Sequence, residues 1–198
     1  NAQVNIGANS ALDVTGSINV HADGYGGASF GGTAGNGIGG QALVMAIEGG
    51  ATITAGSVAA SASGSGGSYI ECSVCGTTGG NGVGGNASVH TNVGTGNSMD
   101  ISGDVTITAA GQGGAGDAQA GGGFGGTASL FAGDNSSLQV GADTEVDASG
   151  LGGDGEENQG GLGRGGTARI GTNTGGSIDL IGPVFVTDCP PRTTYESA

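Results

Sequence analysis

The sequence predicts an all-β fold, a parallel β-helix (β-solenoid) of five repeat units of about 40 residues with long glycine-rich connecting segments. Three observations predict it. Glycine supplies 50 of the 198 residues, against about 7% in an average protein. Apolar residues alternate with small polar ones in short runs, which is typical of strands. The string G-x-G-G-x-A recurs at spacings of 45, 41 and 40 residues, at positions 37–42, 82–87, 123–128 and 163–168.

Each repeat unit is expected to contain three short strands. The first follows the glycine string, a polar turn leads to the second, and a corner that usually contains glycine leads to the third. The units begin near Asn1, Gln41, Asn86, Thr127 and Thr167. The chain returns to the next unit through glycine-rich segments at 24–40, 64–85, 111–126 and 150–166. The solenoid domain therefore spans residues 1–188, and residues 189–198 form an extended C-terminal tail.

Stacking of equivalent units would bury the alternating apolar positions in one continuous core, because a single unit cannot bury its own. The second unit breaks the pattern. In "ATITAG", Ile53 is out of phase with Leu12 and Met99, so we expect a bulge or a register slip there. At about 4.8 Å per coil, five single-coil units would span about 24 Å, and two coils per unit would double that length.

The glycine-rich segments are long for connections, and their lengths are similar. We therefore expect them to be ordered, either as polyproline-II-like stacks or as a flat glycine-rich wall. The alternative is a set of floppy loops on one side of the solenoid.

The charge of the chain argues against several classes of partner. There is no lysine, and three arginines against 17 acidic residues give a net charge of −14. Nucleic acid is therefore not expected as a partner, and anionic lipid would be repelled. No apolar stretch has the length of a membrane span, so membrane insertion is not expected. No cofactor is expected either.

The segment "GLGRGGTARIGT" raises the question of a nucleotide site, because Gly161, Gly163 and Gly166 fit G-x-G-x-x-G. Such a site needs one glycine turn, after a strand and at the start of a helix. Here four copies fit the motif, each leads into a predicted strand, and no helical pattern follows. A P-loop would also need a lysine. The glycines are therefore interpreted as a structural repeat.

The three cysteines lie outside the repeat. Cys72 and Cys75 belong to "YIECSVC" in the longest glycine-rich segment, and Cys189 opens the tail "CPPRTTYESA". A redox site would need a helix in a βαβ context, and zinc would need four ligands. A disulfide is preferred for a secreted chain. Either Cys72 pairs with Cys75, which leaves Cys189 for another chain, or Cys189 pairs with one of them.

Other polar groups are interpreted as surface features. Asp154, Glu156 and Glu157 have the oxygen atoms that calcium prefers, but the nonapeptide calcium repeat is not matched, and a solvated acidic loop is the preferred interpretation. No second carboxylate partner is apparent for glycosidase chemistry. His21 and His90 are expected on the outer faces of different strands.

The units, of the form GGTAxL…SLxV…xVxAxGxGG, resemble the long repetitive surface proteins of Gram-negative bacteria, namely the filamentous-haemagglutinin-like adhesins and autotransporter passenger domains. The resemblance covers residues 1–188. It implies a secreted, right-handed β-helix that works as a fibre or adhesin at the cell surface. The strings "GGTAGNG" and "GGNGVGG" also resemble glycine-rich mycobacterial surface proteins, although the runs of those proteins lack the strands expected here.

The sequence favours a non-enzymatic structural subunit. The coil ends of a solenoid carry unpaired strand edges, which natural solenoids cap, and neither a polar helix nor a charged cap is apparent in this sequence. We therefore expect identical chains to stack head to tail into an extracellular filament. The expected joint comprises Asn1, Val4, Val184, Val186, Cys189, Pro190 and Pro191.

Two alternatives stay open. The chain is either a fragment of a large surface adhesin or a β-helix that binds or cleaves carbohydrate, with surface glycans as partners. The absence of tryptophan and the presence of only three tyrosines and four phenylalanines argue against sugar stacking.

Overall fold

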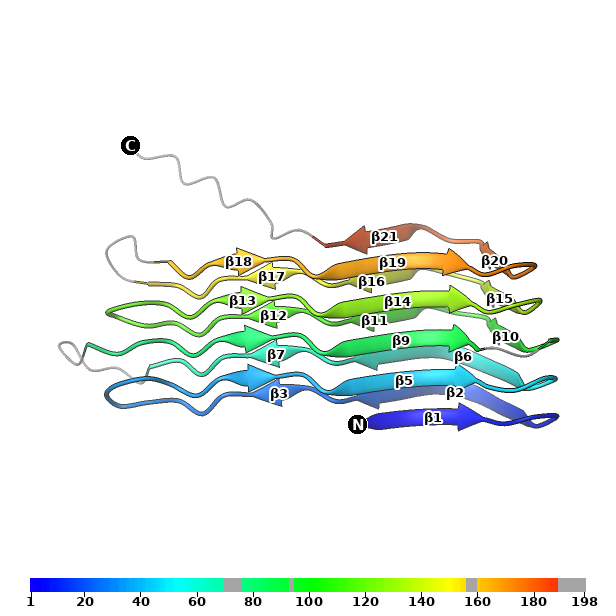
Figure 1. Ribbon diagram of the computed structural model, residues 1–198, viewed down its shortest axis with the longest axis horizontal. Coiled ribbons are helices and arrows are strands. Elements are labelled where there is room, and N and C mark those ends of the chain that lie inside the picture. The colour runs from blue at the N-terminus through cyan, green and yellow to red at the C-terminus, as the bar shows by residue number, and fades with distance from the viewer. Residues whose placement is uncertain (70–75, 93–94, 156–159, 189–198) are drawn as a thin grey trace.

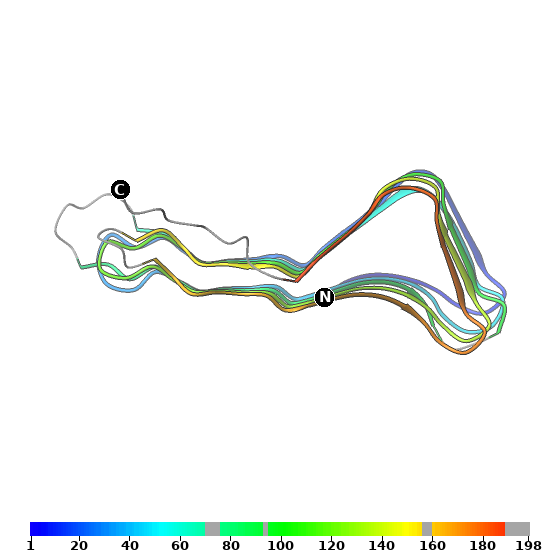
Figure 2. The same cartoon turned by 90° about the horizontal axis from the view of Figure 1, so that it is seen from above.

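A computed structural model describes residues 1–69, 76–92, 95–155 and 160–188. Viewed along the stacking direction, the chain traces a three-sided body that continues into a long, flat arm (Figure 2). Each turn passes around the body and then runs out and back along the arm, and successive turns stack in parallel (Figure 1). The predicted all-β parallel solenoid is confirmed. The body has five rungs and the arm has four, so the chain makes about four full turns.

The first side of the body is a five-stranded parallel sheet with one strand from each unit. Ala42 lies opposite Ala87, and Ala87 lies opposite Ala128. Equivalent residues of successive units therefore face each other, and each unit makes a single coil. The strands are β1 (Ala2–Ile6), β5 (Gln41–Ala46), β9 (Asn86–Thr91), β14 (Thr127–Ala132) and β19 (Thr167–Thr172).

The other two sides of the body belong to one eight-stranded parallel sheet. In the first two units a single strand runs along both sides, and in later units a corner divides the same path into two strands. The undivided strands are β2 (Ala11–His21) and β6 (Thr52–Ser61). The second side then continues with β10 (Ser98–Ile101), β15 (Ser137–Val140) and β20 (Ser177–Leu180). The third side continues with β11 (Val105–Thr108), β16 (Thr144–Asp147) and β21 (Val184–Thr187).

The expected register shift in "ATITAG" is confirmed at its last residue, Gly56, but Ile53 itself is not out of phase. Ile53 lies in register between Leu12 and Met99, and its side chain is only 1% exposed. The irregularity lies at the next corner, where Gly56 alone stands opposite Thr15 and Gly16 and the register of β2 against β6 shifts. The second unit has one residue fewer at this corner than its neighbouring units. If residues are counted back from the third strand of the unit, Ile53 therefore falls out of phase with Leu12 and Met99.

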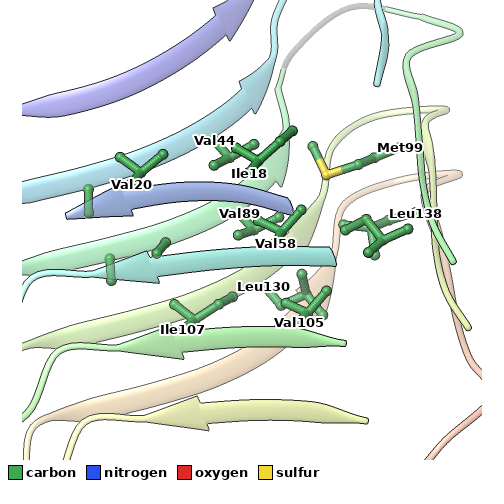
Figure 3. Packing of buried hydrophobic residues seen from close by; sticks show 14 of the residues in the cluster. Ile18, Val20, Val44, Val58, Val89, Met99, Val105, Ile107, Leu130 and Leu138 are labelled. Atoms are coloured by element: carbon green, nitrogen blue, oxygen red, sulfur yellow. The ribbon is translucent and has the colours of Figure 1, made fainter. Parts of the chain in front are cut away.

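Inward side chains from all three sides fill the body (Figure 3). Val44, Val89 and Leu130 stack in one column and are 0% exposed. Val58 and Val105 stack in a column on the third side. Complete burial of such a side chain contributes about 1.5–3 kcal/mol, so the stability of the body comes from these columns.

The arm consists of two parallel sheets of two-residue strands that lie face to face (Figure 2). The outgoing sheet contains β3 (Gly24–Tyr25), β7 (Gly64–Ser65), β12 (Gly111–Gln112) and β17 (Gly150–Leu151). The returning sheet contains β4 (Gly37–Ile38), β8 (Gly82–Val83), β13 (Gly123–Phe124) and β18 (Gly163–Arg164).

The two layers of the arm meet through their backbones. A Cβ atom added to Gly66, Gly82 or Gly123 would lie well under 3.0 Å from a carbonyl oxygen of the other layer, a distance that real Cβ atoms essentially never show. Only glycine allows backbones to approach this closely. The described arm residues thus form the ordered, flat glycine-rich wall that was one of the two expected arrangements.

The carboxylate of Asp117 connects two neighbouring rungs at the arm tip. Thr77 is fully buried, and both its hydroxyl and its backbone N–H donate hydrogen bonds to Oδ1 of Asp117. The N–H of Ala118 donates to the same oxygen at 2.7 Å. The hydroxyl of Thr77 is the main reason that the pKa of Asp117 is lowered, and partial burial works in the opposite direction.

Within the part of the chain that the structure describes, no helix has the length and apolar character that crossing a bilayer requires.

Candidate assembly surfaces at the two coil ends

The N-terminal coil end is an open sheet edge. Among the described residues, β1 pairs only with β5, and β2 pairs only with β6. Val4 points inward in register with Val44, but Val4 is only partly buried whereas Val44 is 0% exposed. Asn1 precedes the edge strand and is exposed. The partly buried apolar side chains at this end are Ala2, Val4, Ile6, Leu12 and Val14.

The C-terminal coil end is open in the same way. In the part of the chain that the structure describes, β19, β20 and β21 are the last strands of their sheets. Val184 and Val186 are 44% and 48% exposed, whereas Val146, the register partner of Val186 one rung below, is 0% exposed. The described part of the chain contains no helix that could cover this end. The other partly buried apolar side chains here are Ala168, Ile170, Ile178 and Leu180.

The two ends present matching columns of side chains. Ala2 and Ala168 are the first and last members of one alanine column, and Val4 and Ile170 are the first and last members of the next apolar column. A second copy placed with its β1 beside β19 would therefore continue both the hydrogen-bond ladder and the core. Because opposite ends meet, the contact is heterologous and does not close into a dimer.

Such a joint would place two acidic residues next to each other in one polar column. Along the outer face of the second side, acids alternate with neutral residues in the order Asp13, Thr54, Asp100, Gln139 and Asp179. All five residues are exposed. Within the chain no two aspartates of this column are neighbours, but stacking in the same register would place Asp179 next to Asp13 of the following copy. The joint therefore carries a like-charge contact that interior rungs avoid.

An open groove of about 450 Å³ lies where the arm leaves the first side of the body. Phe124 and Arg164 line it on the arm side, and Thr127 and Thr167 line it on the body side. Glycines 125, 126, 165 and 166 complete its lining. Phe124 and Arg164 occupy the variable position of the G-x-G-G string, one above the other. The repeat spacing alone contained the signal for this column, which sequence reasoning did not use.

The structure places the remaining candidate residues as follows. Asn1 and Val4 lie at one coil end and Val184 and Val186 at the other, so only contact between copies would bring them together. Asp154 is exposed, and within the described residues no group of three metal-ligating side chains occurs. The candidates that lie outside the described residues are Cys72, Cys75, Glu156, Glu157, Cys189, Pro190 and Pro191.

The two histidines differ in their surroundings. The side chain of His21 is 59% exposed, and its Nδ1 lies 3.5 Å from Oδ2 of Asp23. His90 is partly buried on the outer face between Met45 and Phe131, and burial lowers its pKa. Its Nδ1 lies 2.9 Å from the hydroxyl oxygen of Ser88. The outward positions of both residues agree with the prediction.

Comparisons with protein-family models, with curated proteins and with solved structures found no match to this chain.

Proposed function

We propose that this protein is a non-enzymatic structural subunit of an extracellular bacterial filament, assembled by head-to-tail stacking of solenoids. One observation carries the proposal: the apolar columns that interior rungs bury completely are partly exposed at both coil ends. The extracellular, bacterial setting rests on the resemblance of the repeat to secreted surface proteins.

The chemistry of the ends supports stacking. The edge strands at both ends are already paired on their inner side, so association requires little ordering of the backbone. Each apolar side chain that the joint removes from water contributes about 25 cal/mol per Å² of buried apolar surface. Unpaired N–H and C=O groups along the edge strands gain partners at the same time.

Electron microscopy of purified chain tests the proposal. Val186→Asp places a charge in the inward column of the end strand, and Phe185→Asp places the same charge on the outer face of that strand, where the side chain is already 56% exposed. We expect fibres from the natural chain and from Phe185→Asp, and dispersed particles from Val186→Asp. Circular dichroism checks that both variants keep the β fold.

Two results would overturn the proposal. The first is dispersed natural chain at every concentration tried. The second is equal fibre formation by both variants, which would mean that fibres form through another surface. A parallel sample with reductant tests the separate expectation that a disulfide through Cys189 locks the joint, because loss of fibres on reduction would assign that role to the cysteines.

The acidic column provides a test of the register. Asp179→Asn removes the contact with Asp13 of the next copy, whereas Asp100→Asn changes an acid that lies between Thr54 and Gln139. Two charges about 4 Å apart in water repel by about 1 kcal/mol, so the first variant should assemble at about fivefold lower concentration. Sedimentation measures this threshold. Equal effects of the two variants would contradict the proposed register.

A second candidate function rests on the groove of about 450 Å³ beside Phe124 and Arg164. An aromatic ring, an arginine and two threonine hydroxyls suit a neutral oligosaccharide. Calorimetric titration with such oligosaccharides should show binding that Phe124→Ala abolishes and Phe185→Ala preserves. Heats that are unaffected by Phe124→Ala would exclude the groove as a glycan site.

A further inference from the structure

The body and the arm have different numbers of rungs, and this difference has a consequence at the proposed joint. The body sheets contain five rungs, whereas the arm sheets end at β17 and β18 after four. If β1 of a second copy follows β19, the body continues without a break. The first described arm rung of that copy begins at β3, after its first body rung. The described residues therefore place no arm rung between the last body rung of one copy and the first body rung of the next. Head-to-tail stacking therefore leaves a slot between successive arms. The slot has the height of one rung, about 4.8 Å.

The edges of this slot carry unused hydrogen-bonding groups. Seven hydrogen bonds of 2.8–2.9 Å pass through the arm in one zigzag, in which each glycine N–H donates to the carbonyl of the preceding member. The order from first to last is Gly27, Gly35, Gly67, Gly80, Gly114, Gly121, Gly153 and Gly161. Among the described residues, the N–H of Gly27 and the carbonyl of Gly161 have no partner of this kind. One inserted rung would supply both partners.

The packing of the arm decides what can enter the slot. A Cβ atom on Gly114 would meet the carbonyl oxygen of Gly67, and one on Gly121 would meet that of Gly80, each well under 3.0 Å away. The same clash recurs in the top rung, at Gly153 and Gly161. An inserted rung must therefore have glycine at both corresponding positions.

Residues 189–198 cannot supply this rung. Their sequence, CPPRTTYESA, contains no glycine, so its side chains would meet the carbonyls of the top rung. It also contains two prolines, which have no N–H to donate. The rung therefore requires a segment outside residues 1–198.

We propose that the end of the arm binds a glycine-rich hairpin from a partner polypeptide, with glycine at the positions equivalent to Gly114 and Gly121. The hairpin adds one rung to β17 and β18, and in the filament it fills the slot beneath β3 of the next copy. The filled slot rests on the proposed stacking, whereas binding to the open arm end of a single copy does not. A Cβ atom on Gly111, Gly113 or Gly116 would also meet a carbonyl oxygen of its own rung, so the partner needs glycine at these equivalent positions as well.

The probe is a fluorescent peptide with the sequence of residues 111–126, GQGGAGDAQAGGGFGG. Fluorescence anisotropy measures its binding to the full natural chain and to the Val186→Asp chain, which should not stack. We expect saturable binding to both. A peptide with Gly114→Ala and Gly121→Ala should bind about tenfold more weakly or worse, and a peptide with Gln112→Ala, which changes an exposed outward residue, should bind like the natural one.

A chain variant locates the peptide in the slot. A Cβ on Gly27 meets nothing within 4 Å, whereas one on its equivalent Gly67 meets the carbonyl of the rung beneath it. Gly27→Ala should therefore fold and stack normally but project a methyl group into the slot, and filaments of this variant should lose about tenfold in peptide affinity.

The outcomes separate the two proposals. If the natural chain stays dispersed, stacking is wrong, and binding to single copies still decides whether the arm accepts a glycine rung. Absence of binding to either chain, or equal binding of the doubly substituted peptide, would overturn the hairpin proposal. Equal affinity of natural and Gly27→Ala filaments would exclude the slot as the binding site.

Discussion

The body and the arm of this solenoid are stacked in the same register, but different chemistry holds them together. The body buries columns of valine, leucine and isoleucine, so its stability is hydrophobic and depends on side-chain volume. The arm brings two backbone layers into direct contact, and its stability depends on hydrogen bonds within and between layers. A solenoid can therefore be widened without enlarging its apolar core, provided that glycine occupies the positions where the two backbone layers touch.

The comparison also explains the composition. Glycine loses more backbone entropy on folding than any other residue, so a chain with 50 glycines needs compensation. The arm supplies it by giving most inward amides a partner in the neighbouring rung or layer. Because the body carries the apolar burial, loss of side-chain volume should matter there, and gain of a single methyl group should matter in the arm.

The largest effect is expected from a cavity in the body. Leu130 is 0% exposed between Val89 and Ile170 in its column, and Leu130→Ala should lower the free energy of unfolding by about 2–5 kcal/mol. Thr106→Ala, an outward substitution on β11, is the control and should change it by less than about 0.5 kcal/mol. Urea unfolding followed by circular dichroism measures both. Similar values for the two variants would contradict a body held by side-chain burial.

The next effect sharpens the account of the arm. Gly67→Ala would push a methyl group against the carbonyl of Gly27 and should cost about 1–3 kcal/mol. Gly27→Ala occupies the equivalent position in the first rung, where nothing lies within 4 Å, so it should be neutral or stabilise by about 0.4–1 kcal/mol. The same urea measurements compare them. Equal tolerance of both substitutions would show that the arm layers are not in backbone contact.

A smaller effect on the free energy of unfolding, an increase rather than a decrease, is expected from a substitution at Thr144. This residue stands in a column with Val105 and Val184, and its buried hydroxyl has no hydrogen-bond partner among the described residues. Thr144→Val keeps the shape and removes the unsatisfied group, so it should raise the free energy of unfolding by about 1 kcal/mol. Thermal unfolding provides the check, and a lower melting temperature than that of the natural chain would refute the expectation.

The smallest effect concerns pH at the arm tip. The pKa of Asp117 is lowered in the folded state, mainly by the Thr77 hydroxyl. Its stabilising contribution is therefore present above the ordinary pKa of aspartate and is lost as pH falls through the lowered value. Asp117→Asn should lower the melting temperature near neutral pH. In acid, the difference in melting temperature between this variant and the natural chain should become smaller. Melting temperatures across this range test the sign, and a constant difference would assign the effect to packing.

Much of the fold could be predicted because its two signals are local and periodic. Alternation of apolar residues identified strands such as β14, and the recurring glycine string placed equivalent units at nearly constant spacing. Both signals can be recognised without knowledge of the tertiary contacts, since every rung repeats the environment of its neighbour.

The remaining features depend on contacts that no local pattern encodes. The phase of Ile53 was misjudged because one residue is missing from the corner at Gly56, and register is restored only by pairing with the adjacent rungs. The link between Thr77 and Asp117 joins residues 40 positions apart. The mismatch between five body rungs and four arm rungs follows from where the coil begins relative to the arm, which becomes apparent only after the coil path is known.

The central claim is that the coil ends continue one another in register, and the axial rise of the filament tests it most directly. Five body rungs at about 4.8 Å each predict a rise of about 24 Å per subunit, with the strand spacing uninterrupted across the joint. Helical reconstruction from electron micrographs measures this rise. Filaments with a rise far from this value, or with subunits joined through the faces of their sheets, would contradict end-to-end stacking.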